Sequence, residues 1–147
     1  MSFGGEKAAL FETIAFGTYQ ELIRACEAVT IAVPTHLHYE IAKFALQNGV
    51  HVLVEKPITF DIHQAQELIE LAAKKNLILQ VGHVERFNGA VMALSQIVSE
   101  PLLIQTRRLH PQNNRILDVG VILDLLIHDI DIVLNIVKKP LVKHTAV

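Results

Sequence analysis

Three short runs of β-branched and aliphatic residues constrain the fold of this chain more than any other feature of its sequence. They cover Val29–Val33, Val50–Val54 and Leu77–Val81. Continuous apolar runs of this length are typical of strands that are buried on both faces, as in parallel sheets. The segments between them repeat their apolar residues at the helical spacing of about 3.6 residues. The order strand, helix, strand, helix, strand therefore predicts a parallel α/β sheet.

The helices between these strands have recognisable ends. Gly49 stands where the first helix should stop, and Asp61 is the predicted N-cap of the second, which ends at Lys74 and Lys75. The predicted core positions are Leu37, Ile41, Phe44 and Ala45 in the first helix, and Ala65, Leu68, Ile69 and Ala72 in the second. A short turn and helix within residues 15–23 leads into the first strand. The pair Gly4-Gly5 follows no strand and predicts a flexible N-terminal turn.

After Val81 the pattern changes. The predicted elements are a helix over Asn88–Val98, a strand over Leu102–Leu109, a polar loop over 110–115, a long helix over Val119–Val137 and an extended piece over Leu141–Val147. We interpret residues 1–84 as one domain. Residues 85–147 are then the first elements of a second, α+β domain, which is incomplete.

Charge and hydropathy narrow the class of ligand. The 147 residues include 13 basic and 15 acidic side chains, which are scattered and give a formal charge of −2. This argues against nucleic acid and membranes as partners and favours a small molecule. A single cysteine, Cys26, and a start without signal-peptide features predict a cytoplasmic protein. The mean hydropathy of +0.37 is high for a domain of this size, so we expect a homo-oligomer.

The tripeptide Glu55-Lys56-Pro57 directly follows the second predicted strand. Ligands of open parallel sheets bind beyond the carboxyl ends of the strands, where Lys56 is expected. Its ammonium group can donate to a substrate hydroxyl and stabilise the negative charge that develops there. On the tripeptide alone, a solvated lysine paired with Glu55 explains the pattern as well.

Asp124 and His128 lie four residues apart within the long predicted helix and so share one face. A carboxylate beside an imidazole can orient it as a general base for a hydroxyl proton. The structural alternative is a polar pair that is satisfied within the core. Asp129 and Asp131 are expected on another face, where capping, solvation or packing explains them.

The segment Pro34-Thr35-His36-Leu37-His38 begins a predicted helix just after the first strand. Exposed N–H groups at such a helix start suit a phosphate or ribose, and Thr35 is the predicted N-cap. His36 and His38 lack a third ligand at a sensible spacing, so the sequence predicts no metal site.

Two arginines and an aromatic residue are candidate substrate contacts. Arg86 and Phe87 follow the third strand within VGHVERFN, and Arg108 lies on the strand predicted after it. Arginine can anchor a carboxylate or phosphate, and phenylalanine can cover a ring face. Alternatively, Arg86 pairs only with Glu85 or Glu100.

Three motifs in this order resemble the Gfo/Idh/MocA family of oxidoreductases: AVPTHLHYEIAKFALQNGVHVLVEKPIT, VGHVERFN and LDLLIHDIDIVL. The resemblance covers roughly residues 15–147. It implies a Rossmann domain that binds NAD or NADP and a mixed α/β domain that carries substrate and oligomer contacts. It also implies that Lys56, Asp124 and His128 are catalytic. Pro34, Thr35, His38, Glu55, Lys56 and Pro57 are then expected to line the nicotinamide side of the cofactor.

The second and third motifs are similar to those of members that oxidise the 3-hydroxyl of nucleotide-linked amino sugars, although sugar and cyclitol dehydrogenases share most of them. The 147 residues lack a first strand, a glycine-rich turn with G-x-G-x-x-G spacing and the acidic residue that holds the adenosine ribose. We therefore expect a partial Rossmann-type sheet, truncated at both ends relative to the family, with weak cofactor binding. The alternative function is a non-catalytic remnant that acts as a self-associating or scaffolding module.

Overall fold

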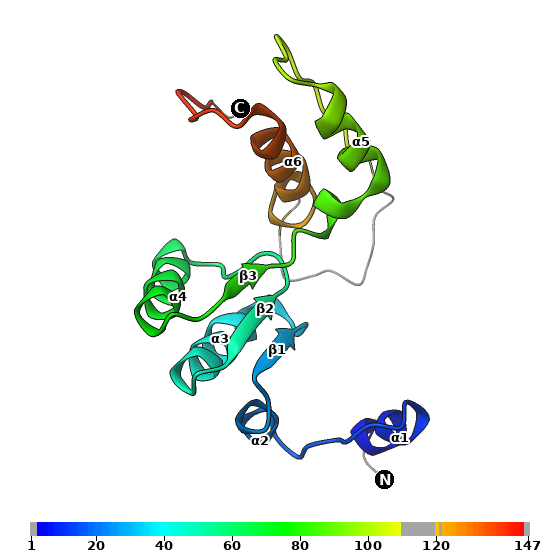
Figure 1. Cartoon of the computed structure of the whole chain (residues 1–147), viewed down its shortest axis with the longest axis vertical. Coiled ribbons are helices and arrows are strands. Elements are labelled where there is room, and N and C mark those ends of the chain that lie inside the picture. Colours follow the sequence, from blue (N-terminus) through cyan, green and yellow to red (C-terminus); the bar gives the residue numbers. More distant parts are fainter. Residues whose placement is uncertain (1–2, 110–119, 121, 146–147) are drawn as a thin grey trace. The chain divides into compact units, whose positions relative to one another are not determined.

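The computed structural model of the chain describes residues 3–109, 120 and 122–145. The chain divides into two compact units, Met1–Val81 and Gly82–Val147 (Figure 1). Across the described ranges, no helix is both long and apolar enough to cross a membrane. The same residues include no cluster of histidine, cysteine or acidic side chains that could hold a metal ion.

The first unit is built on a parallel sheet in the order β1 (Ala28–Ile31), β2 (His51–Val54) and β3 (Leu79–Val81). Ile31 lies opposite Val54, and Val54 lies opposite Val81, so the carboxyl ends of the three strands form one edge. The helices α3 (His38–Gln47) and α4 (Ile62–Lys75) connect successive strands. The predicted parallel α/β arrangement is therefore confirmed.

The core of the first unit lies between the sheet and these two helices. Its fully buried side chains include Val54 on β2, Leu46 on α3 and Leu68 on α4. The opposite face of the sheet carries one row of residues in register, Thr30, Leu53 and Gln80, all of which are exposed. The helices thus cover one face only, and we call this row the open sheet face.

The ends of α3 and α4 follow the sequence signals. Gly49, two residues after α3, has a φ of 82°, which favours glycine. The Asp61 carboxylate accepts a hydrogen bond of 2.7 Å from the backbone N–H of His63 and so caps α4. Asn76, just past Lys75, closes α4 in the left-handed conformation. Of the predicted core positions, Ile69 is instead 52% exposed.

Two short helices precede the sheet. The predicted helix before the first strand is confirmed as α2 (Tyr19–Arg24), and its N-cap Thr18 accepts a hydrogen bond of 3.2 Å from the N–H of Glu21. The helix α1 (Phe3–Leu10) includes Gly4 and Gly5, so the predicted flexible turn is wrong. Five good helix formers follow the glycines over residues 6–10, and they offset a cost of about 1 kcal/mol for each glycine.

The second unit contains a 3₁₀ turn η2 (Val84–Phe87), α5 (Gly89–Ile97), a π turn η3 (Ile122–Leu126) and α6 (Ile127–Val137). Asn88 caps α5 by accepting a hydrogen bond of 3.0 Å from the N–H of Ala90, and this helix matches the predicted Asn88–Val98. Among the described residues of this unit, Ile136 is the one aliphatic or aromatic side chain that is buried.

Two predicted extended segments of the second unit form no strand. Over Leu102–Leu109 the chain is irregular and Leu103 is 84% exposed, and 141–145 is likewise irregular. A single strand has no stability without a neighbour, and no strand of the described residues pairs with either segment. The predicted loop 110–115, the predicted helix start at Val119 and residues 146–147 lie outside the described residues.

Candidate functional site

The carboxyl edge of the sheet in the first unit carries the first group of candidate residues. Pro34 lies three residues after the end of β1, and Glu55 and Lys56 directly follow β2. Because β1 and β2 are paired, the two segments are neighbours. Pro34 is exposed, whereas Glu55 and Lys56 are half-buried. These three residues are therefore accessible to a ligand at the edge where open parallel sheets bind theirs.

The other three candidates of this edge, Thr35, His38 and Pro57, are buried. Thr35 lies in a 3₁₀ turn, Thr35–Leu37, that precedes α3, and Leu37 is the N-cap residue of α3. The prediction that Thr35 caps the helix is therefore wrong. The sequence showed a single helix start, and the extra 3₁₀ turn moves the start of α3 to His38.

His38 has backbone oxygens as the partners of both ring nitrogens. Nδ1 lies 2.8 Å from the carbonyl oxygen of Pro57, and Nε2 lies 2.9 Å from that of Val33. The side chain is 1% exposed, so it holds the backbone and does not face a ligand. The motif that contains His38 did not predict this arrangement. The signal was present, because His38, Ile41, Ala42 and Ala45 repeat at the helical spacing of a core face.

The turn that carries Lys56 is tied to β1 before that residue and to His38 of α3 after it. The N–H of Glu55 donates a hydrogen bond of 3.0 Å to the carbonyl of Ile31 on β1. On the other side the Lys56–Pro57 peptide bond is cis, and the carbonyl of Pro57 faces His38. The loop then reaches α4, with Thr59 Oγ1 donating a hydrogen bond of 2.7 Å to the carbonyl of Asp61.

Asp124 and His128 lie in the second unit, on consecutive turns of one helical segment. Asp124 belongs to the π turn and His128 to α6, and both are half-buried. π turns inside helices are frequent at functional sites. The predicted shared helix is thus present, with one turn wider than a regular α-helix.

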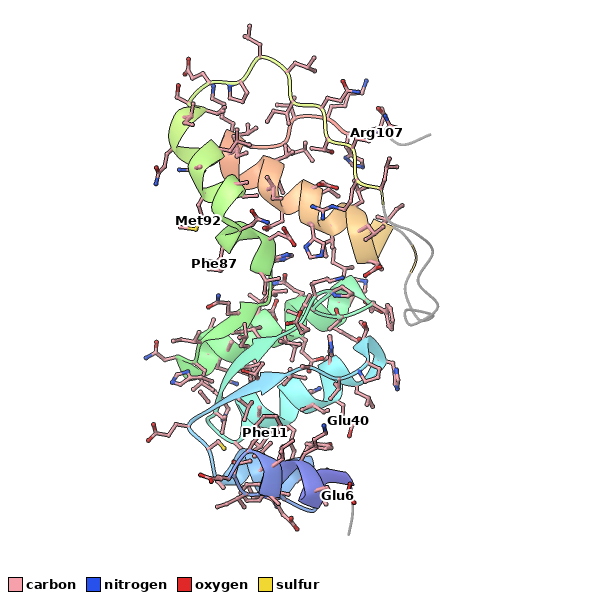
Figure 2. The ribbon with its side chains drawn as sticks, turned by 90° about the vertical axis from the view of Figure 1, so that its right-hand side faces the viewer. Glu6, Phe11, Glu40, Phe87, Met92 and Arg107 are labelled. Carbon is pink, nitrogen blue, oxygen red and sulfur yellow. The ribbon has the colours of Figure 1, made fainter. Side chains whose placement is uncertain are left out.

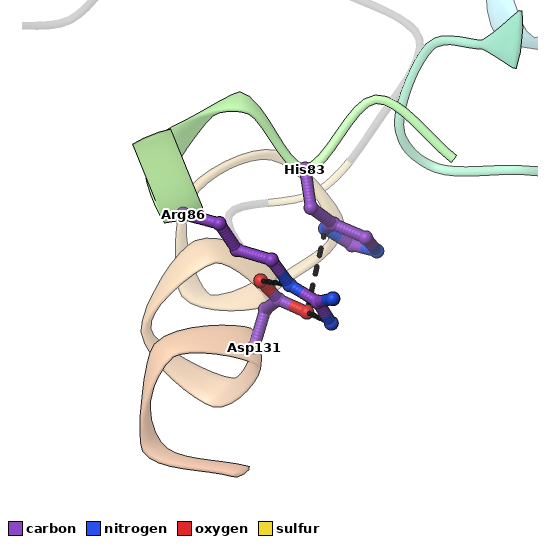
Figure 3. A network of polar contacts seen from close by, with 3 residues as sticks. All are labelled: His83, Arg86 and Asp131. Atoms are coloured by element: carbon purple, nitrogen blue, oxygen red, sulfur yellow. Dashed lines mark hydrogen bonds and ion pairs between the residues drawn. The ribbon is translucent and has the colours of Figure 1, made fainter. Parts of the chain in front are cut away.

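Two salt bridges join α6 to the chain around it. Nε and Nη2 of Arg86 donate hydrogen bonds of 2.7 and 2.5 Å to the carboxylate of Asp131 (Figure 3). Arg108 donates two hydrogen bonds of 3.1 Å to the carboxylate of Asp129. Neither Glu85 nor Glu100 is the carboxylate that Arg86 engages here. Asp129 and Asp131 are therefore explained by ion pairs rather than by capping or solvation.

The ion pairs shift the pKa of Asp131, Arg86 and Arg108. The hydrogen bonds from Arg86 lower the pKa of the Asp131 carboxyl, and a smaller contribution of the same sign comes from His83, whose Nδ1 lies 3.9 Å from Asp131 Oδ1. The same hydrogen bonds raise the pKa of Arg86, and those to Asp129 raise the pKa of Arg108. Asp131 is thus held as a carboxylate at neutral pH.

Phe87 differs from the arginines in that its side chain is 70% exposed. Met92 on α5 is 48% exposed, and both side chains project from the same side of the second unit (Figure 2). An aromatic ring in this position is available to cover a planar ligand or to meet another protein chain.

Comparisons with known proteins place these features in a family. Residues 4–83 match the model of an oxidoreductase family with an NAD-binding Rossmann fold, Gfo/Idh/MocA. The chain is 40% identical to the UDP-N-acetylglucosamine 3-dehydrogenase of Acidithiobacillus ferrooxidans over 130 residues, which are 88% of this chain and 42% of the relative.

Solved structures give the same relationship. The structure of the Acidithiobacillus enzyme matches with a TM-score of 0.88 at 38% identity over 95% of this chain and 46% of its own. A dehydrogenase from Clostridium difficile matches with a TM-score of 0.74 at 29% identity, over 90% of this chain and 44% of its own. The chain thus spans less than half the length of these relatives.

Proposed function

Because the chain belongs to the Gfo/Idh/MocA family of oxidoreductases, we propose that it forms part of a dehydrogenase that acts on a nucleotide-linked amino sugar. Such an enzyme transfers a hydride between a hydroxyl-bearing carbon of the sugar and NAD or NADP. The observation that carries the proposal is the accessible lysine, Lys56, at the carboxyl edge of a parallel sheet. The Acidithiobacillus relative supports the sugar class over a cyclitol.

The residues at this edge fit the nicotinamide end of a dinucleotide. Pro34, Glu55 and Lys56 are accessible there and offer a charged donor and backbone groups. A glycine-rich turn for the pyrophosphate does not occur within the 147 residues. NAD or NADP, when bound, supplies the acceptor for the hydride. The residues of this chain bind and orient its reactive end.

The acid–base chemistry falls to three side chains of this chain. Lys56 donates a hydrogen bond to the reacting hydroxyl oxygen and stabilises the negative charge that develops on it. His128 removes the hydroxyl proton as general base, and Asp124 orients the imidazole. These roles follow from the family resemblance of the motifs that contain the three residues.

The three residues proposed as substrate contacts, Arg86, Phe87 and Arg108, differ in how accessible they are to a substrate. Phe87 is exposed and can cover the base or sugar of a nucleotide. Arg86 and Arg108 already hold Asp131 and Asp129, so any substrate contact would come from the remaining N–H groups of each guanidinium.

A specific observation also favours the alternative function, a self-associating or scaffolding module. Leu53 on the open sheet face and the exposed pair Phe87 and Met92 place apolar side chains in contact with solvent. Surface of this kind marks association sites. Self-association alone does not separate this non-catalytic alternative from a dehydrogenase, because a dehydrogenase can also be a homo-oligomer. Cofactor binding separates them, since a working dehydrogenase must bind NAD or NADP and a non-catalytic remnant need not.

The two halves of the dinucleotide provide a direct test. Reduced nicotinamide mononucleotide and AMP are titrated separately into the ¹⁵N-labelled chain, and the amide signals are followed by NMR. We expect the nicotinamide half to shift the signals of Glu55, Lys56 and Thr35, and AMP to shift none of them. Intact NADH should bind more weakly than a dissociation constant of about 1 μM, which corresponds to roughly −8 kcal/mol.

Two outcomes would contradict the proposal. If the nicotinamide half leaves the signals of Glu55 and Lys56 unchanged at millimolar concentration, the carboxyl edge is not a cofactor site. If AMP shifts the same signals equally, the edge binds phosphate without selecting the nicotinamide. Lys74→Ala, which replaces an exposed lysine of the last turn of α4, is the matched control for nonspecific attraction of anions.

A further inference from the structure

His38 connects two segments that follow neighbouring strands. It is the first residue of α3, and its ring lies between the carbonyl of Val33, just past β1, and the carbonyl of Pro57, just past β2. The distances of 2.9 and 2.8 Å are those of good hydrogen bonds. The three residues belong to the first unit, so the contact lies within one compact body.

The partners of the ring restrict what it can do. A backbone carbonyl only accepts hydrogen bonds, so the ring must be the donor in each contact that forms. A neutral imidazole carries one N–H and donates to one carbonyl at a time, whereas a doubly protonated ring donates to both. In either state the ring is engaged by the backbone. With 1% of its surface exposed, it is not available to a soluble ligand.

The place of Lys56 depends on the two residues beside it. Glu55 is fixed by the hydrogen bond that its N–H donates to Ile31, and Pro57 is fixed through its carbonyl by His38. Lys56 lies between these two anchors and has a half-buried side chain. Loss of the second anchor would leave the hydrogen bond of Glu55 in place and would loosen the turn beyond that residue.

We propose that His38 is a positioning residue, whose ring fixes the Glu55–Pro57 turn against the end of β1 and so sets where Lys56 presents its ammonium group. This inference rests on the proposed function for the importance of Lys56, but the contact that it describes needs no cofactor. His38 touches neither substrate nor cofactor, and it acts through the carbonyl of Pro57.

Amide hydrogen exchange of the ¹⁵N-labelled chain tests the proposal. In His38→Ala, the amides of Lys56 and Ile58 should exchange faster than in the unsubstituted chain by on the order of tenfold, the effect of one lost hydrogen bond on local opening. The amides of Leu68 and Leu71 in α4 should change much less. His38→Gln, which retains a side-chain N–H donor, should restore part of the protection at Lys56.

A matched control separates positioning from general loss of core packing. Leu46→Ala removes a fully buried side chain from the same helix but leaves the contacts of His38 in place. It should accelerate exchange evenly across the first unit. If His38→Ala gives the same even pattern, or if His38→Gln restores nothing at Lys56, His38 is an ordinary core residue and the proposal is wrong.

A measurement on the unsubstituted chain covers the case in which His38→Ala does not fold. At least one ring N–H proton of His38 should be visible by NMR and protected from exchange with water. A ring whose N–H protons all exchange freely would overturn the proposal. Neither readout involves a cofactor, so failure of the nicotinamide titration would end the dehydrogenase proposal while leaving the anchor at Pro57 intact.

Discussion

Lys56 and His128 carry the proposed chemistry, and each has a structural alternative. In the structural alternative, the half-buried lysine after a strand pairs with an acid and has no role in catalysis. In the same way, the half-buried histidine beside an aspartate contributes to the packing of its helix and has no role in catalysis. The alternatives differ in what a substitution changes. Substitution of a catalytic group lowers turnover while the stability of the protein stays the same. Substitution of a structural group lowers the stability of the protein first.

A chimera in which this chain replaces the matching segment of the Acidithiobacillus relative allows turnover to be measured. His128→Ala should lower kcat by about 10²- to 10⁴-fold, the usual contribution of general acid–base catalysis. Lys56→Ala should lower kcat more than it changes the KM for NAD, because its contact strengthens in the transition state. Lys74→Ala serves as control, and kcat and the thermal midpoint are measured for every variant.

The opposite pattern would support the structural alternative. A Lys56→Ala chimera with full activity would remove Lys56 from the catalytic set. A His128→Ala chimera that loses thermal stability in proportion to its activity would mark His128 as part of the helix packing.

For single residues, the sequence predicted where a residue lies in the fold better than which groups it contacts. The place of Lys56 after a buried strand followed from the order of the elements, because carboxyl ends of parallel strands share an edge. The partners of His38 could not be predicted in the same way. Val33 and Pro57 are 5 and 19 residues away from it, and their carbonyls meet its ring only once β1 and β2 have paired.

Between elements, the ion pair of Arg86 and Asp131 connects η2 to α6 and makes this contact sensitive to acid. The pKa of Asp131 is lowered, first by the hydrogen bonds from Arg86, so the folded state favours the carboxylate. The resulting stabilisation is complete above the ordinary pKa of 3.8 and is lost as the pH falls through the lower pKa of the folded state.

We therefore expect α6 to become less protected from hydrogen exchange as the pH is lowered below this range. Asp131→Asn should remove most of this acid dependence. At neutral pH it should also lower the stability of the contact by roughly 1 kcal/mol, since the Arg86 side chain is partly exposed and solvent weakens the pair. Glu100→Gln, which neutralises an exposed acid, is the control, and equal effects of the two substitutions would contradict the assignment.

The elements that the sequence predicted well are those with local causes. The cap at Asp61, the glycine after α3 and the 3.6-residue repeats identify α3 and α4 without knowledge of the rest of the molecule. The strand predicted over Leu102–Leu109 was wrong because a strand needs a partner, and no described strand pairs with this segment. The π turn before α6 was not predictable, because its residues are ordinary helix formers.

At the scale of the whole molecule, the open sheet face predicts self-association. Leu53, at its centre, is 38% exposed, and among the described strands β1 has a partner on one edge only. Parallel sheets are normally covered on both faces, and an unpaired edge can bind another chain. The high mean hydropathy of +0.37 agrees with this arrangement.

Sedimentation velocity should therefore show dimers or larger species at the concentrations used for structural work. Leu53→Glu should weaken association by placing a charge at the centre of the open sheet face. Ile69→Glu, a change of the same kind on an exposed position of α4, should weaken it less. A monodisperse monomer of the unsubstituted chain would contradict the prediction.

The unequal cores of the two units have a consequence for how the protein unfolds. The first unit has a cluster of buried aliphatic side chains. Among the described residues of the second unit, Ile136 is the single buried aliphatic side chain. Burial of such side chains supplies most of the free energy that opposes unfolding. We therefore expect the helices of the second unit to open at a lower free energy than the sheet, so that denaturant unfolds the second unit before the first.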